Sequence, residues 1–330
     1  MRYLFLVLIF LLNSCSQNYA DKLPNWYLKP QANDANYLYG VAYAGSLEQA
    51  EKLALKALAE KLAITIAAEY ELRQQQNIVN EQELYETRSD NKITTQLNKI
   101  KFENFENLQT EKIADKIYVQ VRVSRAELIE QFLTELEQLT NKITQQYQAN
   151  KNTSLAKNFI IFAQLAPTLA EAQEKLAMLK TLGTNDSLRA PYQKIISDLS
   201  QAALVNKQKL KFQIVAKPAD QRFADIFAKQ VNQQNFVVVK QLASDDQGQP
   251  QIKINTVTKQ QKIYGAYQVK ITLTLRLLEH YGNQLASNKL IISGSSVIDE
   301  NSAIDNALEK LTKQLAEQKL LNILGVKIDG

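Results

Sequence analysis

The stretch Lys116-Ile-Tyr-Val-Gln-Val-Arg-Val-Ser-Arg-Ala-Glu127 joins a strand pattern to the start of a helix. Apolar and polar residues alternate over positions 117–123, as they do in a strand that buries one face. Ser124 and Glu127 then have the spacing of a capping box. Apolar residues continue at steps of three and four up to Ile143. We therefore predict a strand followed directly by a helix that packs on its own domain.

An earlier segment has the same order of strand and helix. Positions 37–45 are rich in β-type residues and end at a glycine. Ser46 and Gln49 form a second capping box, and an apolar stripe from Leu47 to Ala68, which includes Leu53 and Ile64, predicts a helix with one face on a sheet. Upstream, Pro24 and Pro30 exclude a helix between them. Polar residues 74–92 predict a connection or a frayed helix end, and residues 93–105 turn β-like.

The second half of the chain begins with helical patterns and continues with mixed ones. Two helices are predicted, separated by Gly183 and the three polar residues after it. A strand, a helix and a further strand follow, then three strands, with a hairpin turn at Tyr281-Gly282-Asn283, and a final helix. The predicted segments are helices 154–182 and 187–205, strand 210–214, helix 218–234, strand 236–239, strands near 252–254, 269–277 and 290–297, and helix 302–324.

These patterns predict an α+β protein with two small domains. Each has helices packed on one face of a mostly antiparallel sheet, and a helical hairpin joins them. The expected boundaries are 23–150 for the first domain, 151–206 for the helical connector and 207–330 for the second domain.

Composition excludes several classes of protein. With 330 residues, 45% of them hydrophobic, and only 9 Gly and 6 Pro, the chain can bury sizeable cores. The net charge of 39 − 34 = +5 is too small to indicate nucleic-acid binding. The single cysteine, Cys15, excludes a disulfide within the chain, and the single histidine, His280, leaves little room for histidine chemistry.

The first residues read as a targeting segment. Met1-Arg2 is followed by ten apolar residues, too few to span a bilayer, and residues 1–14 therefore read as a signal peptide. Leu12-Asn13-Ser14-Cys15 resembles the bacterial lipoprotein box. This resemblance implies a diacylglyceryl thioether and an amide-linked acyl chain on Cys15, with residues 15–22 as a lipidated tether. Ser16, where Asp would imply inner-membrane retention, favours the outer membrane.

A second resemblance rests on motifs in the first domain. They are Pro24-x-Trp26-Tyr27, Tyr37-x-Tyr39-Gly40 before Ser46, and the Lys116 to Glu127 stretch. Together they resemble the Lpp-twenty-type outer-membrane lipoprotein family over about residues 22–145, although Gly40-Val-Ala42 replaces the usual Gly-x-Gly. Relatives include flagellar outer-membrane ring and assembly proteins. The resemblance implies a small α+β domain and brings no catalytic residues.

Candidate sites are few. Ser154-Leu-Ala-Lys157 has the spacing of a serine nucleophile and its lysine, but no Lys-Thr-Gly follows, which favours a helix cap. His280 has no second histidine to share a metal, and Asp245-Asp246 lacks the other ligands of a calcium loop. We expect no catalytic residue, no metal and no cofactor beyond the lipid. Trp26, Tyr27, Tyr37 and Tyr39, with Tyr43 nearby, fit sheet packing better than an interface, but remain interface candidates.

The sequence thus predicts a periplasm-facing outer-membrane lipoprotein. We expect a non-enzymatic scaffold or accessory factor in envelope assembly, with a flagellar or other envelope ring as one candidate. Its partners would be the outer membrane, reached through the lipid, and other envelope proteins or further copies of itself. Binding to peptidoglycan or to a cell-wall synthase is one alternative. An envelope hydrolase that uses Ser154 or His280 is the other.

Overall fold

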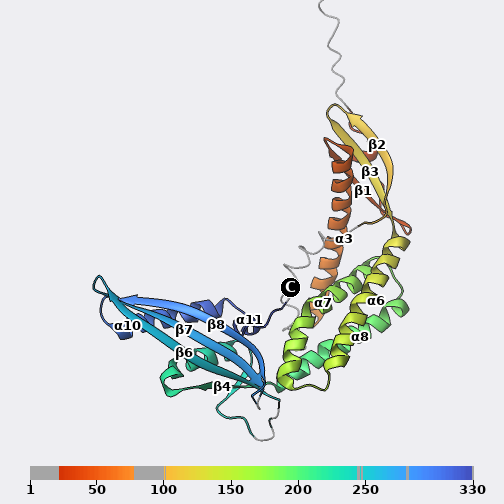
Figure 1. Cartoon of the computed structure of the whole chain (residues 1–330). Helices are drawn as coiled ribbons and strands as arrows, with labels where there is room; N and C mark the ends of the chain where they lie inside the picture. Colours follow the sequence, from red (N-terminus) through yellow and green to blue (C-terminus); the bar gives the residue numbers. More distant parts are fainter. Residues whose placement is uncertain are drawn as a thin grey trace, which may run out of the picture. The chain divides into compact units, whose positions relative to one another are not determined.

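The computed structural model describes residues 22–77, 100, 102–243, 246, 248–279 and 282–328. Cys15, His280, Asp245 and Tyr281 lie outside the described residues. The chain divides into two compact units: unit 1 comprises Met1–Thr134 and Ala177–Asp186, and unit 2 comprises Glu135–Leu176 and Ser187–Gly330. The expected connector at 151–206 is therefore shared between the two units. Helices and strands are labelled in Figure 1.

Unit 1 contains a three-stranded antiparallel sheet in the order β1-β3-β2. Helix α3 packs against β1 and β3, and the short helix α2 contacts β3. Figure 1 shows α3 running alongside the sheet. The bounds are α2 Asn25–Leu28, β1 Tyr37–Ala44, α3 Leu47–Asn77, β2 Glu106–Ile113 and β3 Lys116–Ser124.

Two predictions for unit 1 were wrong. The prolines do not exclude a helix between them, because α2 is a single turn with Pro24 as its N-cap, where a missing N–H costs no intrahelical bond. The β-like composition of residues 93–105 does not mark a strand in its described part, residues 100 and 102–105, since β2 begins at Glu106. Strand β2 lies at the sheet edge and is mostly exposed, so its sequence is polar and shows no strand periodicity.

Small residues let α3 approach the sheet closely. Ala50 and Ala54 are fully buried against Val119 and Val121. A Cβ added to Gly40 would lie 2.4 Å from the backbone oxygen of Ala54. This tight contact explains a further wrong prediction. The apolar stripe is wider than the contact, so Leu53 and Ile64 are 46% and 70% exposed instead of facing the sheet.

Three long helices follow β3. Helix α6 (Arg125–Asn150) starts directly after the strand, α7 spans Leu155–Thr181, and α8 spans Asp186–Lys209. The N–H of Glu127 donates to Oγ of Ser124 at 3.3 Å, and the N–H of Gln49 donates to Oγ of Ser46 at 3.4 Å. The serine caps and the pair of helices predicted around Gly183 are confirmed.

Unit 2 contains a five-stranded sheet in the order β5-β4-β6-β7-β8. Strand β4 is parallel to β5 and β6, and the long pairs β6–β7 and β7–β8 are antiparallel. The predicted α+β class is confirmed. The bounds are β4 Lys211–Ala216, η2 Pro218–Asp220, α9 Gln221–Gln233, β5 Val237–Val239, β6 Pro250–Ile263, β7 Ala266–Glu279, β8 Gln284–Ser296, α10 Glu300–Ala316 and α11 Leu320–Ile323.

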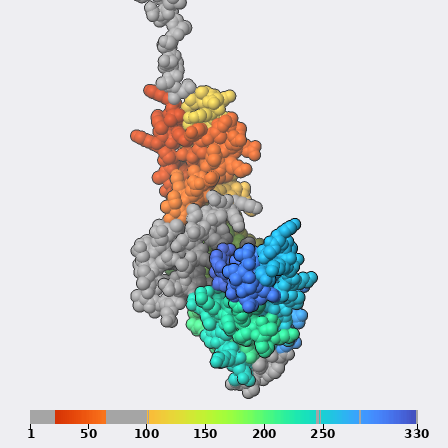
Figure 2. Space-filling model, turned by 90° about the vertical axis from the view of Figure 1, so that its left-hand side faces the viewer, coloured from red at the N-terminus to blue at the C-terminus, as the bar shows by residue number. Residues whose placement is uncertain are grey.

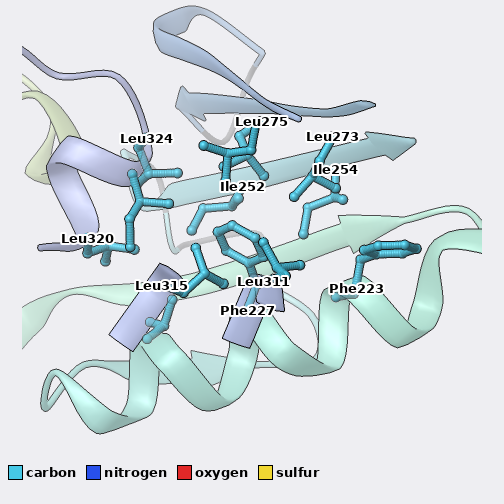
Figure 3. Close-up of a cluster of buried hydrophobic side chains, with 14 of the residues drawn as sticks. Phe223, Phe227, Ile252, Ile254, Leu273, Leu275, Leu311, Leu315, Leu320 and Leu324 are labelled. Atoms are coloured by element: carbon cyan, nitrogen blue, oxygen red, sulfur yellow. The ribbon is translucent and has the colours of Figure 1, made fainter. Parts of the chain in front are cut away.

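Helices α9 and α10 bury their apolar faces against the sheet of unit 2. Figure 3 shows side chains of both helices, of α11 and of strands β6 and β7 meeting in one cluster. Phe227, Ile254 and Leu273 are completely buried, and full burial of a side chain of this size contributes about 1.5–3 kcal/mol. The labelled members are Phe223, Phe227, Ile252, Ile254, Leu273, Leu275, Leu311, Leu315, Leu320 and Leu324.

The final helix does not run unbroken from 302 to 324 as predicted. It divides into α10 and α11, because side-chain amides of α9 and of its C-cap residue bind the backbone at the break. Nε2 of Gln230 donates to the oxygen of Leu315 at 2.9 Å, and Nε2 of Gln234 donates to the oxygen of Gln318 at 3.1 Å. Oε1 of Gln234 accepts the N–H of Leu320 at 2.8 Å. Partners distant in sequence thus end one helix and start the next.

Candidate functional site

An aromatic cluster covers the face of the unit 1 sheet that lies opposite α3. Because side chains alternate along a strand, Tyr118 points away from the α3 face to which Val119 belongs. The ring of Tyr27 meets Tyr118 edge-on at 4.9 Å and Tyr43 at 6.1 Å between centroids. Burial and the two neighbouring tyrosines raise the pKa of Tyr27 above its usual value. The cluster therefore fastens α2 to the sheet.

A second group of polar and aromatic side chains adjoins the start of β1. The hydroxyl of Tyr39 donates to Oδ2 of Asp34 at 3.0 Å. The guanidinium of Arg122 lies 4.3 Å from the centre of the Tyr37 ring and donates to Oε2 of Glu106 at 2.7 Å through Nη2. The carboxylates of Asp34 and Glu106 both accept hydrogen bonds, so this arrangement holds the strand and its preceding loop together.

The structure gathers the four interface candidates into two pairs. The rings of Trp26 and Tyr27 are 6.3 Å apart on α2, and those of Tyr37 and Tyr39 are 6.4 Å apart on β1. Tyr39 is only 4% exposed and belongs to the core, whereas the other three are partly buried. Sheet packing accounts for these contacts, and an interface role for the exposed edges stays a prediction.

A groove of about 690 Å³ runs along α3 in unit 1. In Figure 2, the orange part of unit 1 includes α3. The half-exposed Leu53 forms part of the groove wall, although the apolar periodicity of the sequence predicts that Leu53 lies in the core. The lining residues are Gln49, Lys52, Leu53, Leu55, Lys56, Ala59, Ile100 and Phe102.

The Ser154 region of unit 2 brings together groups that resemble a catalytic cluster. Oγ of Ser154 accepts the N–H of Lys157 at 3.2 Å, which confirms the predicted helix cap. The same hydroxyl donates to Oε1 of Glu279 at 2.5 Å. The other carboxylate oxygen accepts Nδ2 of Asn283 at 3.0 Å. Gly248 closes the cluster, since its carbonyl oxygen accepts the N–H of Ala156 at 2.9 Å.

Electrostatics make Glu279 a poor base for activating a serine. The hydrogen bonds from Ser154 and Asn283, with the charge of Lys157, lower the pKa of its carboxyl below the usual 4.5. A general base works best when its pKa lies near the working pH. The carboxylate thus serves as an acceptor that ties the start of α7 to the end of β7. The sequence contained no local signal for this contact.

The described residues contain no group of three or more His, Cys, Asp or Glu side chains placed to hold a metal ion. In the described ranges, every helix is too short or too polar to cross a bilayer.

Part of the first unit is similar to a known protein family. Residues 24–124 match the LPP20 lipoprotein family. The predicted family resemblance is confirmed over this range, which includes β1 to β3 and ends where α6 begins. The LPP20 match supports a membrane-anchored lipoprotein of the cell envelope. No curated protein matches the sequence.

Solved structures give more distant similarities. The secreted protein HP1454 from Helicobacter pylori aligns with 15% identity and a TM-score of 0.45, over 88% of this chain and 99% of that one. A minor lipoprotein from Acinetobacter baumannii aligns with 12% identity and a TM-score of 0.30, over 36% of this chain and 97% of that one.

Proposed function

We propose that this chain is an outer-membrane lipoprotein that faces the periplasm and acts as a non-enzymatic scaffold or accessory factor in envelope assembly. One observation carries the proposal: the LPP20 match begins at residue 24, nine residues after the cysteine of a lipoprotein box, since 24 − 15 = 9. Ser16 after that cysteine supports the outer membrane over the inner one.

The physical basis of the scaffold role is local concentration. Acyl chains contribute about 0.8 kcal/mol per buried methylene, and two or more chains give stable attachment. Anchoring confines the folded units to a thin layer next to the membrane. Partners held in the same layer then associate at high effective concentration, so each contact can be weak on its own.

The hydrogen bonds of Ser154 support a role without catalysis. Its hydroxyl is committed to Lys157 and Glu279, whose lowered pKa does not suit a general base. The LPP20 resemblance brings no catalytic residues. The hydrolase alternative predicts turnover of purified peptidoglycan that is lost on Ser154→Ala with folding intact. We expect that neither the wild type nor the Ser154→Ala variant hydrolyses peptidoglycan.

Partners would be other envelope proteins, including a flagellar or other envelope ring, or further copies of the chain. The alternative is binding to peptidoglycan or to a cell-wall synthase. Pull-down on purified sacculi tests for peptidoglycan binding, because only a peptidoglycan binder sediments with sacculi from which proteins have been removed. A cell-wall synthase would instead appear among the proteins captured by crosslinking.

The anchor is tested by mass spectrometry and membrane fractionation of cells that express the full chain. We expect a triacylated Cys15 at the mature N-terminus, and recovery in the outer-membrane fraction. Cys15→Ser should make the protein extractable from membranes by an alkaline high-salt wash that leaves the acylated wild type bound, and Ser16→Asp should move the acylated protein to the inner membrane. An unmodified thiol, or a wild-type protein released by osmotic shock, contradicts the proposal.

The scaffold role is tested by crosslinking in intact cells, with capture from wild type and from the Cys15→Ser variant. We expect a specific set of envelope proteins with wild type and a strong reduction with the variant. Equal recovery from the Cys15→Ser variant would mean that acylation does not assist assembly.

A further inference from the structure

Among the described residues, helices α9, α10 and α11 pack together on one face of the unit 2 sheet. On β7 the odd-numbered residues from Val269 to Leu277 are buried in the core, so the even-numbered side chains point to the other side. Strand pairing extends this second face to odd-numbered positions of β6 and β8. We call this second face the open face. It consists of the odd-numbered positions 251–263 on β6, the even-numbered positions 266–278 on β7 and the odd-numbered positions 287–295 on β8.

The open face is strongly cationic. Its exposed charged residues are Lys253, Lys259, Lys270, Arg276 and Lys289. None of the described open-face positions on these three strands is Asp or Glu. Lys253 lies directly opposite Arg276, and Lys259 lies directly opposite Lys270. Like charges in directly opposed positions destabilise a sheet, so this arrangement suits an anionic partner that neutralises them.

Aliphatic side chains lie in a row between these charges. Val257 pairs with Thr272, and Thr272 pairs with Ile291. Val257 and Ile291 are 61% and 58% exposed. The cationic row of Lys259 and Lys270 is two residues further along each strand, a distance of about 6.6–6.8 Å. Charged and apolar groups therefore alternate along one face of the sheet.

The apolar character continues at the end of the sheet. The turn between β6 and β7 protrudes there (Figure 1), with Tyr264 fully exposed. Because Tyr267 pairs with Ser296, the loop after β8 lies at the same end, with Val297 and Ile298 exposed. The nearest acidic side chain in sequence, Asp299, accepts the N–H of Ser302 at the start of α10.

We propose that the open face, with the exposed residues at its end, docks on the surface of an anionic phospholipid bilayer. Headgroup phosphates would neutralise the lysines and the arginine. The aliphatic row and Tyr264 would enter the boundary between headgroups and acyl chains, where amphipathic and aromatic side chains are favoured. A purely ionic partner would leave Val257 and Ile291 in water. This contact goes beyond the acyl anchor on Cys15 and does not require it.

Vesicle flotation tests the proposal on the chain from residue 15 with Cys15→Ser, which carries no acyl chain. We expect flotation with vesicles that contain phosphatidylglycerol, much weaker flotation with phosphatidylcholine alone, and partial loss at high salt, because salt screens the exposed charges. Tyr264→Ser should weaken binding at both salt concentrations, since its contribution is apolar.

Charge variants give the sharpest comparison. Each cation near an anionic membrane surface strengthens binding about fivefold, so the triple variant Lys259→Gln, Lys270→Gln, Arg276→Gln should bind about a hundredfold more weakly. The control is Lys217→Gln, Lys229→Gln, Lys313→Gln, which removes the same charge from exposed positions of unit 2 outside the open face. The control should bind as the parent does. Thermal melting of the open-face variant should be unchanged or higher, because repulsion is removed.

Three outcomes would overturn the proposal. If both triple variants bound vesicles equally weakly, the effect would come from the overall charge of the protein and not from the open face. Failure of the parent chain to float with phosphatidylglycerol vesicles would exclude membrane docking. Binding to purified sacculi without binding to vesicles would assign the open face to peptidoglycan. None of these outcomes affects the anchor, which is tested separately on the lipidated protein.

Discussion

The hydroxyl of Ser154 donates a hydrogen bond to Oε1 of Glu279, which lies 125 residues further along the chain. Ser154 precedes the first residue of α7, and Glu279 is the last residue of β7. A side chain that caps a helix locally thus also fastens that helix to the sheet of unit 2. The Ser-x-x-Lys spacing is therefore that of a helix cap. The contribution of this contact to the stability of the protein can be measured.

Ser154→Ala should lower the free energy of unfolding by about 1–2 kcal/mol near neutral pH, the usual cost of losing an N-cap. The pKa of Glu279 is lowered in the folded protein, with Ser154 as the largest cause. Its stabilisation is therefore complete above pH 4.5 and is lost as the pH falls through the lower folded pKa. In urea unfolding at several pH values, the difference in unfolding free energy between wild type and Ser154→Ala should become smaller in acid. Ser154→Thr, which keeps a hydroxyl, is the control. A difference in unfolding free energy that becomes larger in acid would contradict this account.

Gly40→Ala should destabilise unit 1, because the new Cβ would meet the backbone oxygen of Ala54 at 2.4 Å. Overpacking of this kind costs about 1–3 kcal/mol. Gly45→Ala is the matched control, since its Cβ would have no neighbour within 4 Å. Chemical unfolding of both variants measures the difference. Equal stability of the two would mean that α3 can move away from the strand without cost.

Gln234→Ala should loosen the junction between α10 and α11, because its amide accepts the N–H of Leu320 and donates to the oxygen of Gln318. Loss of two such hydrogen bonds costs about 1–3 kcal/mol. Faster hydrogen exchange at Leu320 should accompany the lower stability. Gln233→Ala, at an exposed neighbouring position, should change neither quantity. Exchange at Leu320 that stays slow in the Gln234 variant would argue against the junction as described.

Tyr39→Phe should raise the pKa of Asp34 while leaving it below its usual value of 3.8. The backbone N–H groups of Asn36 and Tyr37 are the largest causes of the low pKa, and they remain after the hydroxyl is removed. Carboxyl titration by NMR measures the change. An Asp34 pKa that does not move would mean that the Tyr39 hydroxyl has no influence on the carboxylate.

The sequence predicts this structure best where a conformation depends on neighbours along the chain. The caps at Ser46, Ser124 and Ser154 form as predicted, because an N-cap requires only a hydroxyl next to a free backbone N–H. It failed at β2, whose edge position removes the alternation that marks a half-buried strand. It also missed the turn at Tyr264 and Gly265, which both have positive φ, since neither matches the usual Asn-Gly or Asp-Gly signal.

The chain by itself determined the α+β class, the main helices and strands, the lipoprotein box and the family resemblance. These follow from periodicity and short motifs, which are local properties. Only the tertiary structure decided that Leu53 is exposed, that one helix divides into α10 and α11, and that five cations share the open face. Each of these depends on segments far apart in sequence, whose contact distances and strand register no local pattern contains.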